Sequence, residues 1–171
     1  MVATPIASTV YRRDRESVRQ LIDSGWEIDA YDEKGQTALV YAICSVIPGR
    51  DRDFIAYLLS LGADPSIPER QRTRTPLHMV AQDGDTEVAE LLLEHGANPN
   101  AQEENGNTPL WEAVFRAGKS GVSPMIQVLV AAGADPTMKN NSGVSSLDLA
   151  KNLSKQDAYQ FLTSVGDRCD R

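Results

Sequence analysis

The feature that most restricts how this chain can fold is a short sequence motif that recurs at a nearly constant interval. In this motif Gly and Ala are followed by Asp or Asn and then by Pro. It occupies residues 61–65, 95–99 and 132–136, with a degenerate copy at 24–28. A second motif begins with Thr or Ser and places an apolar residue two positions later; its copies start at residues 4, 37, 75, 108 and 145, in steps of 33, 38, 33 and 37. Self-similarity with this period predicts a solenoid of stacked units.

Both motifs have a direct physical interpretation, which is clearest in the third unit. Thr75 is a typical helix N-cap, and Pro76 suits the first helical position because the N–H that proline lacks would be unpaired there. Apolar residues at helical spacing continue through both halves of the unit. Gly96 supplies the left-handed residue that ends the second helix, and Pro99 keeps that helix from resuming. One unit is therefore predicted as turn, helix, tight turn, helix and stop.

Three segments of the third unit closely resemble the ankyrin repeat: Thr-Pro-Leu-His-Met-Val-Ala at 75–81, Glu-Val-Ala-Glu-Leu-Leu-Leu at 87–93 and Gly-Ala-Asn-Pro-Asn at 96–100. The resemblance extends over nearly the whole chain. It implies a single all-α domain at 1–171, an ankyrin-repeat solenoid of about five helix-turn-helix units with short hairpin turns between them. The implied repeats lie at about 1–30, 31–67, 68–101, 102–138 and 139–165, followed by a short tail at 166–171. The first and last repeats match least well, as capping repeats with one face in water should.

Two units depart from the standard length. From the Thr to the Gly that ends the second helix they span 37–62 and 108–133, four residues more than 75–96. The extra residues lie between the two helices, at Pro48–Asp53 and Gly118–Pro124, and their Gly and Pro content favours loops. We expect both loops to project from one rim and to leave a notch over Gln82–Asp85; neutral length drift is the alternative. The hairpin at 70–74 lacks its usual Gly, so its turn conformation stays open.

Composition and charge narrow the classes of partner. The 171 residues are 41% hydrophobic with a formal net charge of −7, which argues against general binding to nucleic acid or to an anionic membrane surface. No apolar run approaches the roughly 18 residues of a transmembrane helix, and residues 1–20 lack the apolar run of a signal peptide. The two cysteines, Cys44 and Cys169, are too few for a disulfide framework. We therefore expect a cytoplasmic protein that is monomeric on its own.

The sequence offers little from which to build an enzyme. Its two histidines, His78 and His95, are the residues on which a Ser-His-Asp or Cys-His arrangement would depend. The family resemblance implies that His78 bonds to the neighbouring hairpin, and His95 precedes a helix-ending Gly, where a cation suits the helix dipole. Neither a phosphate-binding Gly-rich loop nor a His-Glu-x-x-His motif is present. We expect no enzymatic activity, no cofactor, no metal and no small-molecule substrate.

The resemblance also implies where a partner would bind, namely the hairpin tips and the exposed end of each first helix. Carried over onto this sequence, those positions are Tyr11, Arg12, Lys34, Gln36, Ser45, Arg72, Arg74, Gln82, Asp83, Glu104, Asn105, Asn107, Trp111, Phe115 and Arg116. Tyr11, Trp111 and Phe115 are the candidate apolar anchors, because aromatic residues dominate the energetics of protein interfaces. The alternative for Trp111 and Phe115 is packing between repeats. Phe115 and Arg116 are also expected at the wall of the notch.

Charge is distributed unevenly along the chain, and this bears on the kind of partner. Residues 75–115 carry eight acidic and no basic side chains, whereas residues 1–74 carry 11 acidic and 10 basic ones. An acidic middle favours a basic partner, although a solvated outer-helix face would give the same pattern. A module without an effector domain can act by occupying its partner. We therefore expect a protein-binding inhibitor, such as the immunity protein of a cognate toxin; the alternative is an adaptor that links two proteins.

Overall fold

A computed structural model of the chain describes residues 9–44 and 51–169, with the side chains of 167–169 excepted. Within these ranges no strand forms, and an isolated bridge joins Lys139 to Ser145. The helices are α2 (Arg15–Asp23), α3 (Ala38–Cys44), α4 (Arg52–Ser60), α5 (Pro76–Asp83), α6 (Thr86–Glu94), α7 (Pro109–Arg116), α8 (Pro124–Ala131), α9 (Ser146–Asn152) and α10 (Gln156–Cys169). Residues 9–11 are also helical and precede α2. None of the helices in the described ranges combines the length and the apolar character needed to cross a membrane.

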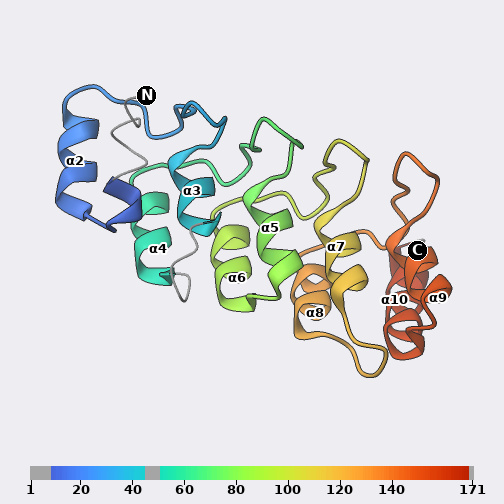
Figure 1. Cartoon of the computed structure of the whole chain (residues 1–171). Coiled ribbons are helices and arrows are strands. Elements are labelled where there is room, and N and C mark those ends of the chain that lie inside the picture. The colour runs from blue at the N-terminus through green and yellow to red at the C-terminus, as the bar shows by residue number, and fades with distance from the viewer. Residues whose placement is uncertain (1–8, 45–50, 170–171) are drawn as a thin grey trace.

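The helices pair in chain order and form two layers (Figure 1). One helix-turn-helix unit is made by each of the pairs α3 and α4, α5 and α6, α7 and α8, and α9 and α10. The first helices α3, α5, α7 and α9 lie side by side as an inner layer, and α4, α6 and α8 lie side by side as an outer layer. Hairpins connect successive units and project beyond the helices on one side of the array. The predicted all-α solenoid of helix-turn-helix units is confirmed.

Helix ends follow the capping chemistry of the repeated motifs. Thr108 is the N-cap of α7, and its hydroxyl oxygen accepts a hydrogen bond from the backbone N–H of Trp111 at 3.2 Å. The second helices α4 and α6 begin after aspartates: the carboxylate of Asp85, for example, accepts from the backbone N–H of Val88 at the start of α6. Gly96 follows α6 with a φ of 91°, a left-handed conformation that residues with a side chain rarely adopt. The threonine and glycine signals act locally, which is why the sequence predicted these ends.

Two hairpins are closed by a buried carboxylate at their first position. The side chain of Glu103 accepts from the backbone N–H of Asn107 at 3.1 Å, and that of Glu69 accepts from the backbone N–H of Arg72 at 2.8 Å. Glu69 and Glu103 are each only 6% exposed. The two hairpins are joined in turn by a backbone hydrogen bond from the N–H of Glu104 to the carbonyl oxygen of Arg72. These acids therefore hold the hairpins in shape.

The hairpin before α5 differs from the others. Gly35, Gly106 and Gly143 occupy the left-handed position in three hairpins, with φ between 74° and 77°. In the hairpin at 69–74 the corresponding residue is Thr73, with a φ of 54°. A β-branched side chain in this region is strained. The turn that the sequence left open is thus left-handed without a glycine.

A continuous core runs between the two layers. Leucines from successive units form most of its centre, and Leu92 is fully buried as predicted. The fully buried leucines at matching positions are Leu39, Leu77 and Leu110 in the first helices and Leu58, Leu92 and Leu129 in the second helices. Because each unit packs on its neighbours, a loss in one unit weakens the interfaces on both sides.

Arginines at the N-terminal end join the first unit to the second. The guanidinium of Arg13 pairs with Asp51 at 3.3 Å. Arg15 donates to the backbone carbonyl oxygen of Asp53 at 3.0 Å and lies over the ring of Tyr57, 5.2 Å from its centroid. The basic residues of the first repeat thus make contacts between units in addition to facing water.

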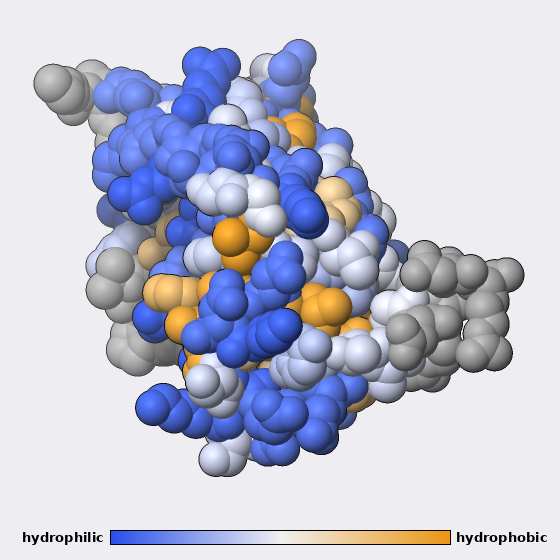
Figure 2. All heavy atoms as spheres, turned by 90° about the vertical axis from the view of Figure 1, so that its right-hand side faces the viewer, coloured by the Kyte–Doolittle hydropathy of each residue, from blue (hydrophilic) through white to orange (hydrophobic). Residues whose placement is uncertain are grey.

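The C-terminal end is closed by α10, whose Ala158 and Leu162 are buried. Hydrophilic side chains cover most of this end of the array, as a capping repeat requires (Figure 2). Lys155, just before α10, is 6% exposed, and its Nζ donates to the carbonyl oxygens of Phe115 and Ala117. These two oxygens belong to the C-terminal end of α7, which would otherwise lack partners. The last unit therefore holds the end of α7 in place.

Candidate protein-binding surface

The predicted binding residues that the structure brings together lie on α5 and α7, neighbours in the inner layer (Figure 1). We call the surface formed by the hairpins and the exposed sides of α3, α5 and α7 the hairpin face. Its centre contains Arg74 and Gln82 from the α5 side and Trp111, Phe115 and Arg116 from the α7 side. Helix α5 packs more extensively against α7 than against any other helix, so these side chains project from two closely packed helices.

Arg74 is the polar centre of the hairpin face. It is half-buried, and its Nη2 donates to the side-chain oxygen of Gln82 at 2.6 Å and lies 3.4 Å from the carbonyl oxygen of His78. Its Nε is buried and has no hydrogen-bond partner among the described residues. In a guanidinium fixed in this way, the second terminal nitrogen, Nη1, is left to donate to a carboxylate or carbonyl oxygen of a partner.

Trp111 and Phe115 form an aromatic stack one helical turn apart on α7. Their ring centroids are 5.4 Å apart and their planes differ by 10°. Trp111 is half-buried and packs against the core, while Phe115 remains 50% exposed. The alternative for these two residues was packing between repeats. Trp111 is partly packed in this way, whereas Phe115 is mainly exposed to solvent. An exposed ring that is already ordered loses little conformational entropy when a partner covers it.

Glu112, between the two aromatic residues in sequence, was missed by sequence reasoning. Burial raises the pKa of its carboxyl group, and the nearby Arg74 guanidinium counteracts that effect, with Glu103 and Arg116 making smaller contributions. The sequence did indicate a half-buried position here. Glu112 lies four residues after Thr108, and the equivalent residue four positions after Thr75 is the apolar Met79. Its ionised form is therefore held in a partly desolvated position that a cation of a partner could stabilise.

A hollow of about 230 Å³ lies at the C-terminal ends of α5 and α7. Gln82 and Asp83 line one side, and Arg116 lines the other. It overlaps the Gln82–Asp85 segment over which the notch was predicted, and Arg116 is part of its lining. The notch itself depends on both inserted loops and stays a prediction. Phe115 does not line this hollow, because it stacks on Trp111 instead.

The inserted segment of the fourth unit is a loop between two helices. In the fourth unit α7 ends at Arg116 and α8 begins at Pro124, so the extra residues form a loop. That loop is tied to the last unit, since the N–H of Gly121 donates to the carboxylate of Asp157. In the second unit residues 45–50 lie outside the described residues, and α4 already begins at Arg52, within the predicted loop. The shared rim therefore stays a prediction.

The other predicted residues lie apart from the centre of the hairpin face or serve the hairpins themselves. Ser45 is outside the described residues. Gln36 and Asn107 are half-buried, and the side-chain oxygen of Asn107 accepts from Asn140 Nδ2 at 2.7 Å. The exposed members of this group are Tyr11, Arg12, Lys34, Arg72, Glu104 and Asn105. Tyr11 and Arg12 lie shortly before α2 in the chain, in the first repeat.

Both histidines have structural roles. Nδ1 of His78 accepts from the backbone N–H of Thr75 at 3.2 Å, and Nε2 lies 3.0 Å from the carbonyl oxygen of Asn107 in the next hairpin, as the family resemblance implied. His95 ends α6, where its Nδ1 lies 2.9 Å from the carbonyl oxygen of Leu91. Within residues 9–44 and 51–169, no group of three or more His, Cys, Asp and Glu residues is arranged to hold a metal ion.

The acidic residues of the stretch 75–115 have different structural roles. Asp85 caps α6 and Glu103 closes a hairpin. On the side of the hairpin face, Asp83 lines the hollow, Glu104 is exposed at a hairpin and Glu112 is half-buried on α7. The exposed acids of the outer layer are Glu87, Glu90 and Glu94 on α6. The acidic residues are therefore divided between the outer layer and the side of the hairpin face, and a basic partner stays a prediction.

Comparison with known proteins agrees with this architecture. The family model described as ankyrin repeats (three copies) matches residues 51–140. A B-cell lymphoma 3 protein homolog of Mus musculus is 29% identical over 86% of this chain and 32% of its own length. Ankyrin repeat and SOCS box protein 16 of Mus musculus is 33% identical over 78% of this chain and 31% of its own length.

A bacterial relative is also similar. A putative ankyrin repeat-containing protein of Treponema pallidum (strain Nichols) is 33% identical over 84% of this chain and 46% of its own length. The chain thus spans less than half the length of the curated relatives that it matches.

Proposed function

Since this chain belongs to the ankyrin-repeat family, we propose that it binds one partner protein across the centre of the hairpin face and acts by occupying the partner's surface. Ankyrin repeats are protein-binding modules, and the repeats here fill most of the described chain. The finer proposal is stoichiometric inhibition, including the case in which the chain is the immunity protein of a toxin.

The observation that carries the proposal is the ordered and exposed aromatic stack beside a fixed guanidinium. Phe115 is 50% exposed and lies on Trp111, with Arg74 anchored by Gln82 on the neighbouring helix. Exposed aromatic and arginine side chains in one place are typical of the residues that contribute most to binding energy. The hollow beside them can receive a side chain of the partner.

The distribution of charge is the basis for proposing a partner with basic groups around an apolar centre. Asp83, Glu104 and Glu112 contribute acidic groups on this side of the molecule, and residues 75–115 contain no Lys or Arg. Arg72, Arg74 and Arg116 flank this stretch on the same surface, so the basic groups of the partner would meet the acids between them. Acidic groups at the margin steer a basic partner toward the surface and accelerate association. A chain that is monomeric without its partner and a cytoplasmic location belong to the same proposal, and the net charge of −7 favours the monomer through repulsion between copies.

The proposal is tested by affinity capture from cells of the source organism. The parent chain and the variant Phe115→Ala/Arg116→Ala are used as paired baits, and bound proteins are compared by mass spectrometry. We expect a protein that the parent captures and the variant does not. The matched control is Leu153→Ala, which removes another exposed apolar side chain outside the hairpin face and should capture as the parent does.

The mode of action is tested with the captured protein. If the chain is an inhibitor, the partner's activity falls to a minimum at one molar equivalent of the chain, and the Phe115→Ala/Arg116→Ala variant does not inhibit. A partner bound equally by both baits would contradict the site. A partner that is bound through this site but remains fully active would contradict inhibition. The adaptor function would then be the alternative that remains.

A further inference from the structure

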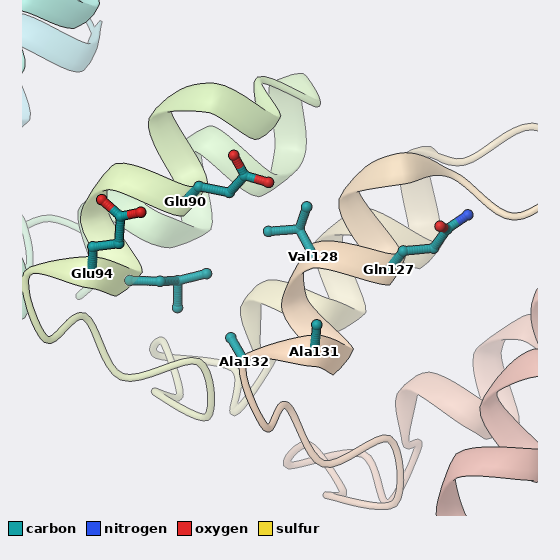
Figure 3. A pocket seen from close by; sticks show the side chains of 7 residues that line it. Glu90, Glu94, Gln127, Val128, Ala131 and Ala132 are labelled. Atoms are coloured by element: carbon teal, nitrogen blue, oxygen red, sulfur yellow. The ribbon is translucent and has the colours of Figure 1, made fainter.

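A second hollow lies on the opposite layer, between the outer helices α6 and α8. It has a volume of about 540 Å³. Glu90, Leu93 and Glu94 of α6 form one wall, and Val128 with Ala131 of α8 forms much of the other. Figure 3 shows the two glutamates along one side and Val128 projecting from the facing helix. This groove shares no lining residue with the hollow of the hairpin face.

Small side chains on α8 create the groove. At matching positions of the two units, counted from the helix-ending Gly96 and Gly133, α6 has Glu94 where α8 has Ala131. Residues 120–134 contain no charged side chain, so the wall made by α8 is neutral and largely apolar. An outer helix of a solenoid normally carries polar residues on its exposed side. The exposed apolar strip on α8 is therefore unusual for its place in the fold.

The opposite wall is acidic. Glu90 and Glu94 are both exposed and stand one helical turn apart on α6, where like charges repel each other in the free protein. Glu94 is the last residue of α6 and Ala131 the last of α8, so the negative ends of two helix dipoles lie at the same end of the groove. A cation bound there would relieve this repulsion and meet both dipoles favourably.

We propose that this groove is a second protein-binding site, and that it takes a helical segment of a partner bearing an apolar side chain with Lys or Arg one turn away. The apolar side chain would lie on Val128 and Ala131, and the cation would lie between Glu90 and Glu94. A helix in an apolar groove is a common mode of recognition. A second copy of this chain fits less well, because each copy has a net charge of −7. With two sites on opposite layers, one molecule could hold two proteins at once.

The test uses the full chain and three synthetic helical peptides of equal length. The first has leucines on one face flanked by lysines, the second has glutamates in place of the lysines, and the third has serines in place of the leucines. Binding is measured by isothermal titration and by the methyl NMR signals of Leu93, Val128, Ala131 and Ala132. We expect saturable binding of the first peptide alone, with these signals shifting.

Variants separate the groove from general charge attraction. Glu90→Gln/Glu94→Gln should weaken binding of the first peptide at least tenfold, and Ala131→Arg, which places a cation in the groove, should abolish it. The matched control Glu87→Gln/Glu104→Gln removes the same charge from exposed acids outside the groove and should change the affinity less than twofold. All these positions are exposed, so circular dichroism should show an unchanged fold.

Several outcomes would overturn the proposal. If Glu90→Gln/Glu94→Gln and the control Glu87→Gln/Glu104→Gln weaken binding of the first peptide equally, the attraction depends on net charge alone. Binding that survives the loss of the leucines, or that survives Ala131→Arg, would place the peptide elsewhere. A dimer of the parent in sedimentation that Ala131→Arg dissociates would show that a second copy occupies the groove. Phe115→Ala/Arg116→Ala should leave peptide binding intact, which keeps this test separate from that of the hairpin face.

Discussion

The Nε2 atom of His78 lies 3.0 Å from the carbonyl oxygen of Asn107, so a side chain of α5 bonds to the hairpin of the next unit. The other ring nitrogen, Nδ1, accepts from the backbone N–H of Thr75, which leaves the proton on Nε2. A neutral ring satisfies both partners, and a protonated one would lose the bond from the backbone N–H of Thr75, keeping only the contact of Nδ1 with the Thr75 hydroxyl at 2.8 Å. Burial lowers the pKa of His78 to about 4.

This lowered pKa predicts a pH dependence of stability. The folded protein binds fewer protons at His78 than the unfolded chain, so the contribution of His78 is complete above about pH 6.5 and is lost as the pH falls toward about 4. The loss amounts to as much as about 3 kcal/mol. Urea unfolding at pH 7, 6, 5 and 4 should show a smaller decline for His78→Gln than for the parent. Parallel pH profiles of the two proteins would contradict the prediction.

Leu92 should be essential to the stability of the middle units. It is fully buried on α6 between neighbouring repeats. Leu92→Ala should lower the free energy of unfolding by about 2–5 kcal/mol, measured by equilibrium urea unfolding. Leu153→Ala is the control, because Leu153 is 36% exposed and should lose less than about 1 kcal/mol. A change within experimental error for Leu92→Ala would refute its place in the core.

Lys155 should contribute more to the stability of the fold than a lysine usually does. Its Nζ donates to the carbonyl oxygens of Phe115 and Ala117 at the end of α7. Lys155→Met keeps the apolar stem but leaves both oxygens without this donor, at a cost of about 1–3 kcal/mol in unfolding free energy. Amide exchange at Gly121 should accelerate at the same time. The exposed Lys151 provides the control, and a Lys151→Met variant as destabilised as Lys155→Met would argue against the capping role.

Replacing Thr73 by glycine should stabilise the protein. Thr73 has a φ of 54°, in a position that glycine holds in the hairpins of Gly35, Gly106 and Gly143. Relief of this strain should raise the unfolding free energy by about 1 kcal/mol, after the greater entropy of glycine in the unfolded chain is subtracted. Thr73→Ala shortens the side chain but keeps Cβ, so it should give much less. If the alanine variant gains as much as the glycine variant, the strain has another source.

Charge on the hairpin face should set the rate at which a captured partner binds. Asp83→Lys/Glu104→Lys should slow association at low salt and flatten its dependence on ionic strength, because it removes steering charges from one side of the molecule. The control Glu16→Lys/Glu87→Lys makes the same change in net charge on exposed residues of α2 and α6. Stopped-flow rates that stay the same in both variants would mean that the acidic stretch only contacts solvent.

Much of the fold was predictable because its signals are local. A Thr or Ser cap, a proline at the first helical position and a glycine after the second helix act within a few residues of themselves, and their repetition determined a solenoid. Thr108 caps α7 and Gly96 ends α6, as the sequence indicated. The burial of Leu92 followed from helical periodicity in the same way.

The surface depended on contacts between residues distant in sequence. Phe115 was recognisable as an exposed position, but its stacking on Trp111 and the support of α7 by Lys155, 40 residues away, come from the stacked units. The separation of acidic residues 75–115 between two faces, and the groove beside Ala131, likewise arise only when α6 and α8 lie side by side. Sequence therefore determined which helices form and where they end, because capping and periodicity are short-range. Tertiary structure decided which side chains share a surface, because that depends on how far each unit lies from the next.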